Sequence, residues 1–386
     1  MALLKKYLIS TPIKETWPND KNTHLIFSSI SPLKKLPDKN FFYKKFNINS
    51  KFWNDKNLVK NFTYIDNLYE KIFDKFYKHL NKIHKTKHTK KFWRILVGPW
   101  LFTYIFILFD RWQNISTALK KYNINKVKIL NFNKKILTPY EAKDFILTSS
   151  KDLWNQYIYQ NICKELLPIK KIEQINFNIK NYIEKDINFS IEDRSKINIA
   201  KKIIFSFFNL FNKKNYPYFI YKGYISAFNE LKLSLMLRQA PTLYFSKKKY
   251  ITNKSINYNL RQSISAIIKP KNKFESFLFK NLKDQVPKVF LENFTDLISF
   301  SSKSNLPKKP KKIYTANALW HDSFFMYHAA KLTEKGSKII YAQHGGAYGI
   351  SKYSWIEKHE KKIADKYLTW GWKGTKSEKN IKSFYI

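Results

Sequence analysis

Glycine is scarce in this sequence. The chain has 386 residues but only 8 Gly, and six of them fall between Gly336 and Gly374. Three of these six, Gly345, Gly346 and Gly349, lie in the segment YAQHGGAYG close to His344. Because Gly adopts positive φ readily and lets a ligand approach the main chain, this segment is the first candidate for a functional site.

Cysteine and several familiar motifs are also missing. A single Cys163 excludes an internal disulfide framework and a zinc site built from cysteines. The sequence contains no G-x-G-x-x-G, P-loop, H-E-x-x-H or G-x-S-x-G pattern. Dinucleotide-binding, ATPase, zinc-protease and serine-hydrolase functions therefore lack their usual support.

No apolar run reaches the length of about 20 residues that a membrane-spanning helix needs. The longest, ILVGPWLFTYIFILF at 95–109, carries Gly98 and Pro99 near its start. We expect a buried core helix here, with a membrane-associated segment as the alternative. The N-terminus has too short an apolar run for a signal peptide, so the sequence predicts a cytoplasmic protein.

Arginine is rare although the chain is strongly basic. Of the 72 basic residues only five are Arg, and the formal net charge is +44. The lysines are spread along the chain among Asn, Ile, Phe and Tyr, as in products of AT-rich genes, and they lack the clustered Arg that reads phosphates and bases. We expect no specific nucleic acid partner, and peripheral contact with an anionic membrane stays open.

The apolar pattern predicts an α/β fold, a Rossmann-like parallel sheet with a large helical insertion at about 150–300. Strands are expected at 6–10, 24–28, 126–132, 311–317, 338–343 and 365–372, and helices at 139–148, 228–240, 273–282 and 322–336. We interpret 1–304 as the N-terminal α/β domain. The strand–helix–strand segment in 305–386 is expected to complete the same domain, in a right-handed βαβ unit.

His344 is the candidate catalytic residue. It follows a predicted strand, and ligands bind beyond the carboxyl ends of parallel strands. Imidazole also has the pKa best suited to proton transfer near neutral pH. Gln343, Gly345 and Gly346 are expected to bind substrate beside it, with the glycines at positive φ. The alternative is that His344 only caps the strand and that the glycines form a turn.

Other residues are expected near this site or are weaker candidates. Asn317 ends the preceding predicted strand and is expected to bind substrate at the same edge. The loop after the first strand, with Thr11, Glu15 and Trp17, is expected to do so as well.

The carboxylates that could orient the imidazole are Asp322, Glu357, Glu360 and Asp365. His321 and His328 are weaker candidates, and His84 and His88 are interpreted as solvated; no metal site is expected.

Several segments, in order along nearly the whole chain, resemble the bacterial surface-carbohydrate biosynthesis transferases. They are YLISTPIKETWP at 7–18, WRILVGPWL at 93–101, LSLMLRQAP at 233–241, VPKVFLENF at 286–294, IIYAQHGGAYG at 339–349 and DKYLTWGW at 365–372. The His-Gly element is also similar to that of capsule sugar transferases and polyol-phosphate polymerases, where the His lies in the cleft between two Rossmann-like domains.

The resemblance implies a glycosyltransferase B architecture and a sugar transfer. A nucleotide-sugar would be the donor, with no tightly bound cofactor, and a surface glycan or lipid-linked molecule would be the acceptor. His344 would act as a base on the acceptor hydroxyl or contact the donor phosphate. A non-catalytic remnant or partner subunit is the alternative function, and a basic nucleic-acid-binding protein is a weaker one.

The sequence departs from the family pattern at two places. It reads IFSSIS at 26–31 where the family tends to show Gly-Glu-Trp-Cys. It also stops at Ile386, shortly after the WGW segment, where relatives continue into a second Rossmann-like domain. We therefore expect the second domain to be missing and the chain to be C-terminally truncated.

Overall fold

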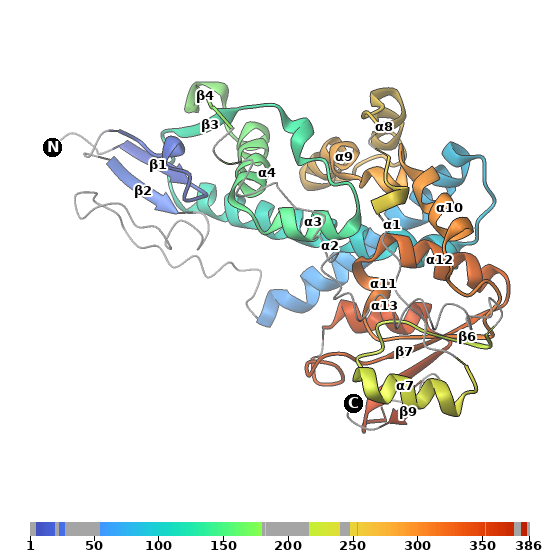
Figure 1. The fold of residues 1–386 in the computed structure, drawn as a ribbon. Coiled ribbons are helices and arrows are strands. Elements are labelled where there is room, and N and C mark those ends of the chain that lie inside the picture. Colours follow the sequence, from blue (N-terminus) through green and yellow to red (C-terminus); the bar gives the residue numbers. More distant parts are fainter. Residues whose placement is uncertain are drawn as a thin grey trace.

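The computed structural model describes residues 5–19, 23–27, 55–179, 182, 216–239, 248–252, 254–351, 353–373 and 380–383. Within these ranges the protein is a mixed α/β molecule with three parallel sheets, two of which are joined by a bridge, so that the strands form two groups. Figure 1 shows β1 and β2 at one end, the sheet that contains β6, β7 and β9 at the other, and long helices between them. Residues 28–31 of the segment IFSSIS, where the sequence departs from the family pattern, lie outside the described residues.

The first group of strands comes from the N-terminal half. β1 (Lys5–Ile9) pairs in parallel with β2 (Thr23–Phe27), and β3 (Val127–Asn131) pairs in parallel with β4 (Ile172–Asn176). A parallel bridge between Tyr7 and Lys126 joins the two pairs. The resulting spatial order is β2, β1, β3, β4, with all strands parallel.

The second sheet has five parallel strands in sequence order, β5 (Tyr218–Ile220), β6 (Lys312–Thr315), β7 (Lys338–Ala342), β8 (Lys366–Trp370) and β9 (Asn380–Ser383). The predicted βαβ unit is present, because α12 (Ser323–Glu334) connects β6 to the parallel strand β7. β5 and β9 flank the βαβ strands and β8. Residues 305–386 therefore do not extend the sheet of β1, and the division into domains stays a prediction.

Two long helices form the centre of the molecule. α1 (Asp55–His84) packs against α2 (Lys90–Lys121), and most of the α2 residues from Phe92 to Leu108 are buried. The Thr89 side chain caps α2 by accepting a hydrogen bond from the Phe92 amide. The apolar run at 95–109 is thus a buried core helix, as predicted.

Helix α2 is also long and apolar enough to cross a membrane, but 83% of its most apolar window is buried inside the protein. A lipid-facing helix would instead expose its apolar side chains. The burial explains the apolar composition of α2 without a membrane. No other helix among the described residues passes the same test of length and hydropathy.

Shorter helices surround this centre. They are α3 (Ala142–Ser149), α4 (Asp152–Leu166), α7 (Ala227–Met236), α8 (Tyr258–Ser265), α9 (Lys273–Gln285), α10 (Phe294–Lys303), α11 (Ala318–His321) and α13 (Trp355–Ile363), with 3-10 turns at η1 (Lys14–Thr16), η4 (Lys134–Leu137), η5 (Ile169–Lys171), η6 (Lys248–Tyr250) and η7 (Lys288–Phe290). Helix α2 contacts α4 in one half of the molecule and α12 and α13 in the other. The α1–α2 pair thus connects the two groups of strands.

Candidate active site

His344 lies at the carboxyl edge of the five-stranded sheet, where the sequence places it. It follows β7, which is flanked by β6 and β8. Only 18% of its side chain is exposed, so the ring is neither in the apolar core nor fully solvated. A partly exposed imidazole at this edge can meet a ligand. Its catalytic role stays a prediction.

A tyrosine and a carboxyl group lie directly against the His344 ring. The Tyr348 hydroxyl is 3.3 Å from Nδ1 and 3.2 Å from Nε2, and Glu360 Oε1 is 3.5 Å from Nδ1. The Tyr348 hydroxyl also donates to Glu360 Oε1 over 3.1 Å. The three side chains therefore form one polar cluster, in which a proton can be shared.

Glu360 is the buried member of this cluster. It sits on α13, its exposed fraction is 1%, and its Oε2 accepts a hydrogen bond of 2.9 Å from the Tyr367 hydroxyl on β8. Burial raises the pKa of Glu360 to about 8, although the neighbouring tyrosine hydroxyls oppose the rise. The Tyr341 hydroxyl is also close enough to affect this pKa, but it has no hydrogen bond of standard geometry.

Burial acts on His344 in the opposite direction. It lowers the imidazole pKa below the usual value, while a hydrogen bond to the Ala316 backbone opposes the effect. The neutral ring therefore dominates at neutral pH and can accept a proton. The Glu360 carboxyl, 3.5 Å from Nδ1, is protonated at neutral pH and therefore contacts the ring without a negative charge.

Gln343 holds the loop of His344 in place. Its Oε1 accepts from the Trp370 amide over 3.0 Å and from Trp372 Nε1 over 2.7 Å, and its Nε2 donates to the Gly345 carbonyl over 2.8 Å. The side chain is 3% exposed. Both the oxygen and the nitrogen of this amide are thus hydrogen-bonded within the protein. Gln343 positions the loop, and its contact with substrate stays a prediction.

The glycines beside His344 differ in backbone conformation and in the space around them. Positive φ occurs at Gly349 (75°) and not at Gly345 or Gly346. A Cβ on Gly349 would lie 2.7 Å from Trp372 Cε2, and one on Gly345 would lie 3.1 Å from Tyr348 Cε2. A Cβ on Gly346 would meet nothing within 4 Å. The expectation of positive φ at Gly345 and Gly346 is wrong, because Gly349 makes the turn.

Asn317 lies at the same edge, just beyond β6. Its Oδ1 is buried without a hydrogen-bond partner. A buried acceptor without a partner is costly, and ordered water or a ligand often satisfies it. The preceding Ala316 contacts His344, so Asn317 is beside the candidate base. Asn317 thus follows a residue that contacts His344, and its role in binding substrate stays a prediction.

The segment after β5 also reaches this edge, which the sequence did not reveal. The Tyr224 ring centroid is 6.0 Å from that of His344. Lys222 and Tyr224 have positive φ of 49° and 59°, although neither is glycine. Strained backbone of this kind is concentrated at functional sites. The sequence signal for β5 is the short apolar run YFIY at 218–221, which is followed by Lys222 and Gly223.

Thr11, Glu15 and Trp17 do not lie with His344. They follow β1, which belongs to the other group of strands (Figure 1). Thr11 Oγ1 donates to Gln156 Oε1 over 2.7 Å, Trp17 Nε1 donates to the Thr11 carbonyl over 3.1 Å, and Glu15 accepts from Tyr182 over 3.1 Å. The expected contact of this loop with His344 is therefore absent, because the sheets are separate.

Of the four carboxylates near His344 in sequence, only Glu360 contacts its ring. Asp322 caps α12 by accepting from the Phe325 amide, and it also accepts from Tyr221 and Lys222, each over 3.2 Å. Glu357 accepts from the Gly349 amide over 2.9 Å and so fixes the far end of the loop. Asp365 accepts from the Ile339 amide on β7 over 2.8 Å.

The other histidines make structural contacts. His328 is buried, hydrogen-bonded to Ser301 and to the Pro307 carbonyl, and its pKa is lowered to about 4, chiefly by burial. His84 packs on Phe294 and contacts the Phe290 carbonyl, and His88 stacks on Phe92 and contacts Glu334. The interpretation of both His84 and His88 as solvated is therefore wrong. Among the described residues, no group of three or more His, Cys, Asp or Glu side chains could hold a metal ion.

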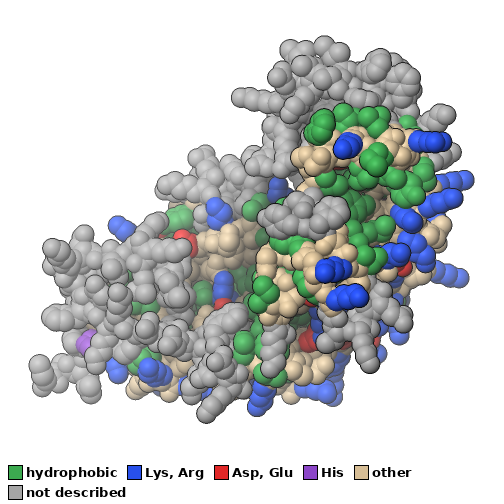
Figure 2. All heavy atoms as spheres, turned by 90° about the horizontal axis from the view of Figure 1, so that it is seen from below, with side chains coloured by type: hydrophobic (Ala, Val, Ile, Leu, Met, Phe, Trp, Pro, Cys, Tyr) green, Lys and Arg blue, Asp and Glu red, His purple; other side chains and the backbone are tan. Residues whose placement is uncertain are grey.

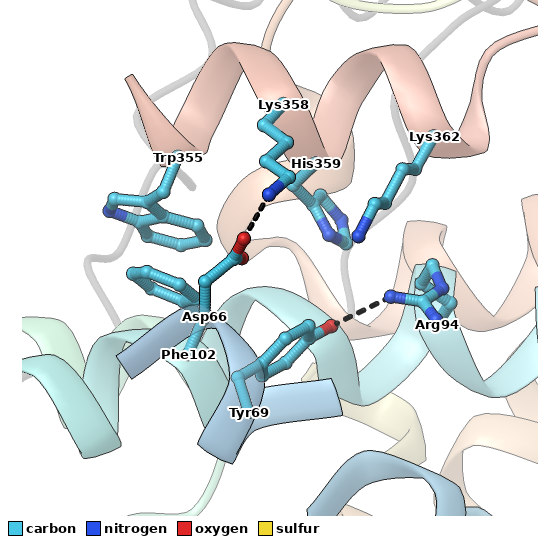
Figure 3. Close-up of a pocket in the computed structure, with 8 residues that line it drawn as sticks. All are labelled: Asp66, Tyr69, Arg94, Phe102, Trp355, Lys358, His359 and Lys362. Carbon is cyan, nitrogen blue, oxygen red and sulfur yellow. Dashed lines mark hydrogen bonds and ion pairs between the residues drawn. The ribbon is translucent and has the colours of Figure 1, made fainter. Parts of the chain in front are cut away.

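A second polar cluster lies on the opposite side of α13, between α1, α2 and α13 (Figure 3). Its charged groups pair with one another: Lys358 with Asp66, and both Arg94 and Lys362 with Glu70. His359 Nε2 is buried without a partner, and burial with nearby Arg94 lowers its pKa to about 3. A hollow of ≈ 420 Å³ opens beside this cluster.

This hollow is less suitable than the His344 edge as a reaction site. Its aromatic walls are already stacked in pairs, Phe62 with Tyr353 and Phe102 with Trp355. Its lysines, Lys358 and Lys361, are paired with carboxylates. The lysines and aromatic rings there are engaged with other side chains, whereas Asn317 Oδ1 at the His344 edge has no partner.

Comparison with known proteins supports a transferase. Neither the curated proteins nor the solved structures yield a match to the chain. A family model described as LIC12162 family transferase matches residues 6–385. Because the matched region spans nearly the whole chain, the protein belongs to the LIC12162 family of transferases.

Proposed function

We propose that the protein transfers a sugar from a nucleotide-sugar donor to a hydroxyl of a glycan or lipid-linked acceptor, with His344 as the base. The observation that carries the proposal is the polar cluster at the carboxyl edge of β7. There a partly exposed imidazole contacts Tyr348 and the buried Glu360. Family membership supports group transfer, and the sugar chemistry is our proposal.

In the proposed reaction a neutral His344 removes the proton from the acceptor hydroxyl as its oxygen attacks the anomeric carbon. The bond between that carbon and the donor phosphate oxygen breaks, and the nucleotide leaves with the electron pair, as UDP or GDP from their sugars and as CMP from a CMP-sugar. The protonated Glu360 carboxyl, 3.5 Å from Nδ1, and the Tyr348 hydroxyl, 3.2 Å from Nε2, position the ring. General-base catalysis of this kind contributes about 10²–10⁴-fold.

The same edge offers groups for the remaining parts of the substrates. The Asn317 Oδ1 can accept a hydrogen bond from a sugar hydroxyl. Lys222, beside the strained turn after β5, pairs with Asp322 over 3.2 Å and would exchange this partner for a donor phosphate on binding. We also propose that the two groups of parallel strands correspond to the two lobes of a glycosyltransferase B architecture.

The proposal is tested by nucleotide release from UDP-, GDP- and CMP-sugars with wild type and with His344→Ala. We expect activity to fall by about 10²–10⁴-fold, with the free energy of unfolding changed by less than about 1 kcal/mol because the ring is partly exposed.

Gly346→Ala is a matched control at the same loop, since its Cβ meets nothing within 4 Å. Full retention of turnover in His344→Ala would assign His344 a structural role. If no donor is consumed or bound, the sugar-transfer proposal fails.

A further inference from the structure

Helix α7 exposes large apolar side chains to the surroundings. Phe228 is 74% exposed, Leu235 is 62% exposed and Met236 is 73% exposed. Phe228 and Leu235 are seven positions apart, which places them on one face of the helix. Single exposed apolar residues are normal on a protein surface, but a group on one short helix marks an interaction surface.

The polar residues of α7 fit an anionic partner. Lys232 lies between the apolar residues, four positions from both Phe228 and Met236, and Arg238 follows the helix. Both are exposed, and neither forms an ion pair with a residue that the structure describes. The single acid of the helix, Glu230, is half-buried, and burial raises its pKa. The face therefore combines apolar side chains with positive charge.

Figure 2 views the molecule from below Figure 1, the side on which α7 lies, and shows hydrophobic side chains with Lys and Arg at their margins. The helix is held rigidly at its end, because the Gln239 side chain donates to the Tyr218 carbonyl and accepts from the Tyr218 amide on β5. It is also close to the candidate active site along the chain. Tyr224, near His344, precedes the α7 cap Ser226 by two residues.

We propose that α7 docks the protein on an anionic lipid surface, with Phe228, Leu235 and Met236 inserted at the headgroup boundary. Amphipathic helices with apolar residues and flanking Lys or Arg bind in this manner. The formal net charge of +44 adds a long-range attraction to anionic lipid. A docked α7 would bring the His344 edge to the membrane. This consequence rests on the proposed function, since a lipid-linked acceptor would be presented there.

The test is co-sedimentation of the full chain with vesicles of phosphatidylcholine alone and with vesicles that contain roughly 30% phosphatidylglycerol, which gives the surface a negative potential. We expect binding to the anionic vesicles that weakens with salt. Phe228→Gln together with Leu235→Gln should reduce the partition coefficient about tenfold or more. The matched control is Ile169→Gln, which alters an isoleucine 87% exposed on η5 and should leave binding unchanged.

Other outcomes would overturn the proposal. Equal binding by the Phe228 and Leu235 double variant and wild type would show that α7 is not the docking face. A concentration-dependent dimer in light scattering that the same double variant abolishes would assign the face to a second copy of the chain. His344→Ala should bind vesicles as wild type does, so a failure of docking and a failure of the proposed catalysis can be told apart.

Discussion

At the scale of single residues, the pKa of Glu360 links the candidate site to stability. This buried carboxyl has a folded-state pKa of about 8, above its ordinary value of 4.5. Between these two pH values the unfolded chain loses the proton that the folded protein keeps. The free energy of unfolding contributed by this group is thus fully present below the ordinary pKa and is lost as pH rises toward 8.

Glu360→Gln should remove this pH dependence, because the amide mimics the protonated acid and does not titrate. We expect the variant to gain on the order of 2–4 kcal/mol relative to wild type between pH 5 and pH 8. Urea unfolding at several pH values measures the difference. Asp365→Asn is the control in the same region. A stability difference between Glu360→Gln and wild type that does not change with pH would show that the buried carboxyl ionises normally.

Gly349 is the second residue whose effect can be predicted from its surroundings. It has φ of 75°, and an added Cβ would lie 2.7 Å from the Trp372 ring, whose Nε1 donates to Gln343. Gly349→Ala should therefore destabilise the fold by about 1–3 kcal/mol and loosen the His344 loop. Thermal unfolding and nucleotide release are the measurements. Gly346→Ala should change neither by much, and equal effects of both substitutions would contradict this assignment.

At the scale of elements, the sequence predicted the helices and strands that have a clear apolar pattern. Strands β1, β2, β3, β6, β7 and β8 and helices α3, α7, α9 and α12 fall within one to three residues of the expected starts. Strands β4 and β5 were missed within the region interpreted as helical. The β4 segment IEQIN has only two apolar residues, and none of its residues is buried. β5 has only three residues, and its pairing with β6 depends on a strand more than 90 positions away.

The contact between α2 and α13 depends on Gly98. A Cβ there would lie 2.7 Å from His359 Cε1 and 2.9 Å from the Tyr69 hydroxyl. Alanine favours a helix by about 1 kcal/mol over glycine, but the clash with a buried ring should outweigh this gain. We expect Gly98→Ala to lower the free energy of unfolding by about 1–2 kcal/mol.

A double-mutant cycle tests this explanation. In a His359→Ala background, Gly98→Ala should cost at least about 1 kcal/mol less than in wild type, since the ring that clashes is gone. Chemical denaturation of the four proteins gives the coupling energy. Additive effects would place the strain elsewhere in the helix pair.

At the scale of the whole molecule, the sequence predicted the fold class better than the assembly of the site. The Gly-rich segment identified the loop of His344 because glycine is otherwise so rare. The sequence did not reveal that Tyr348 and Tyr367 would both donate to the Glu360 carboxyl, because α13 and β8 must fold back on β7 to bring them together. We also predicted from the sequence that the loop of Thr11 lies at His344. This prediction is wrong because local sequence patterns do not show which sheet a strand joins.

The position of α2 has a mechanical consequence. This helix of 32 residues is about 48 Å long, and it packs against α4 near one group of strands and against α12 and α13 near the other. Proteins that close by a hinge usually bend at a thin connection, whereas here a buried rod crosses the junction. Motion of one sheet relative to the other must therefore bend or slide along α2. The two halves should accordingly melt together in a single cooperative transition, with the α2 amides among the last to exchange with solvent.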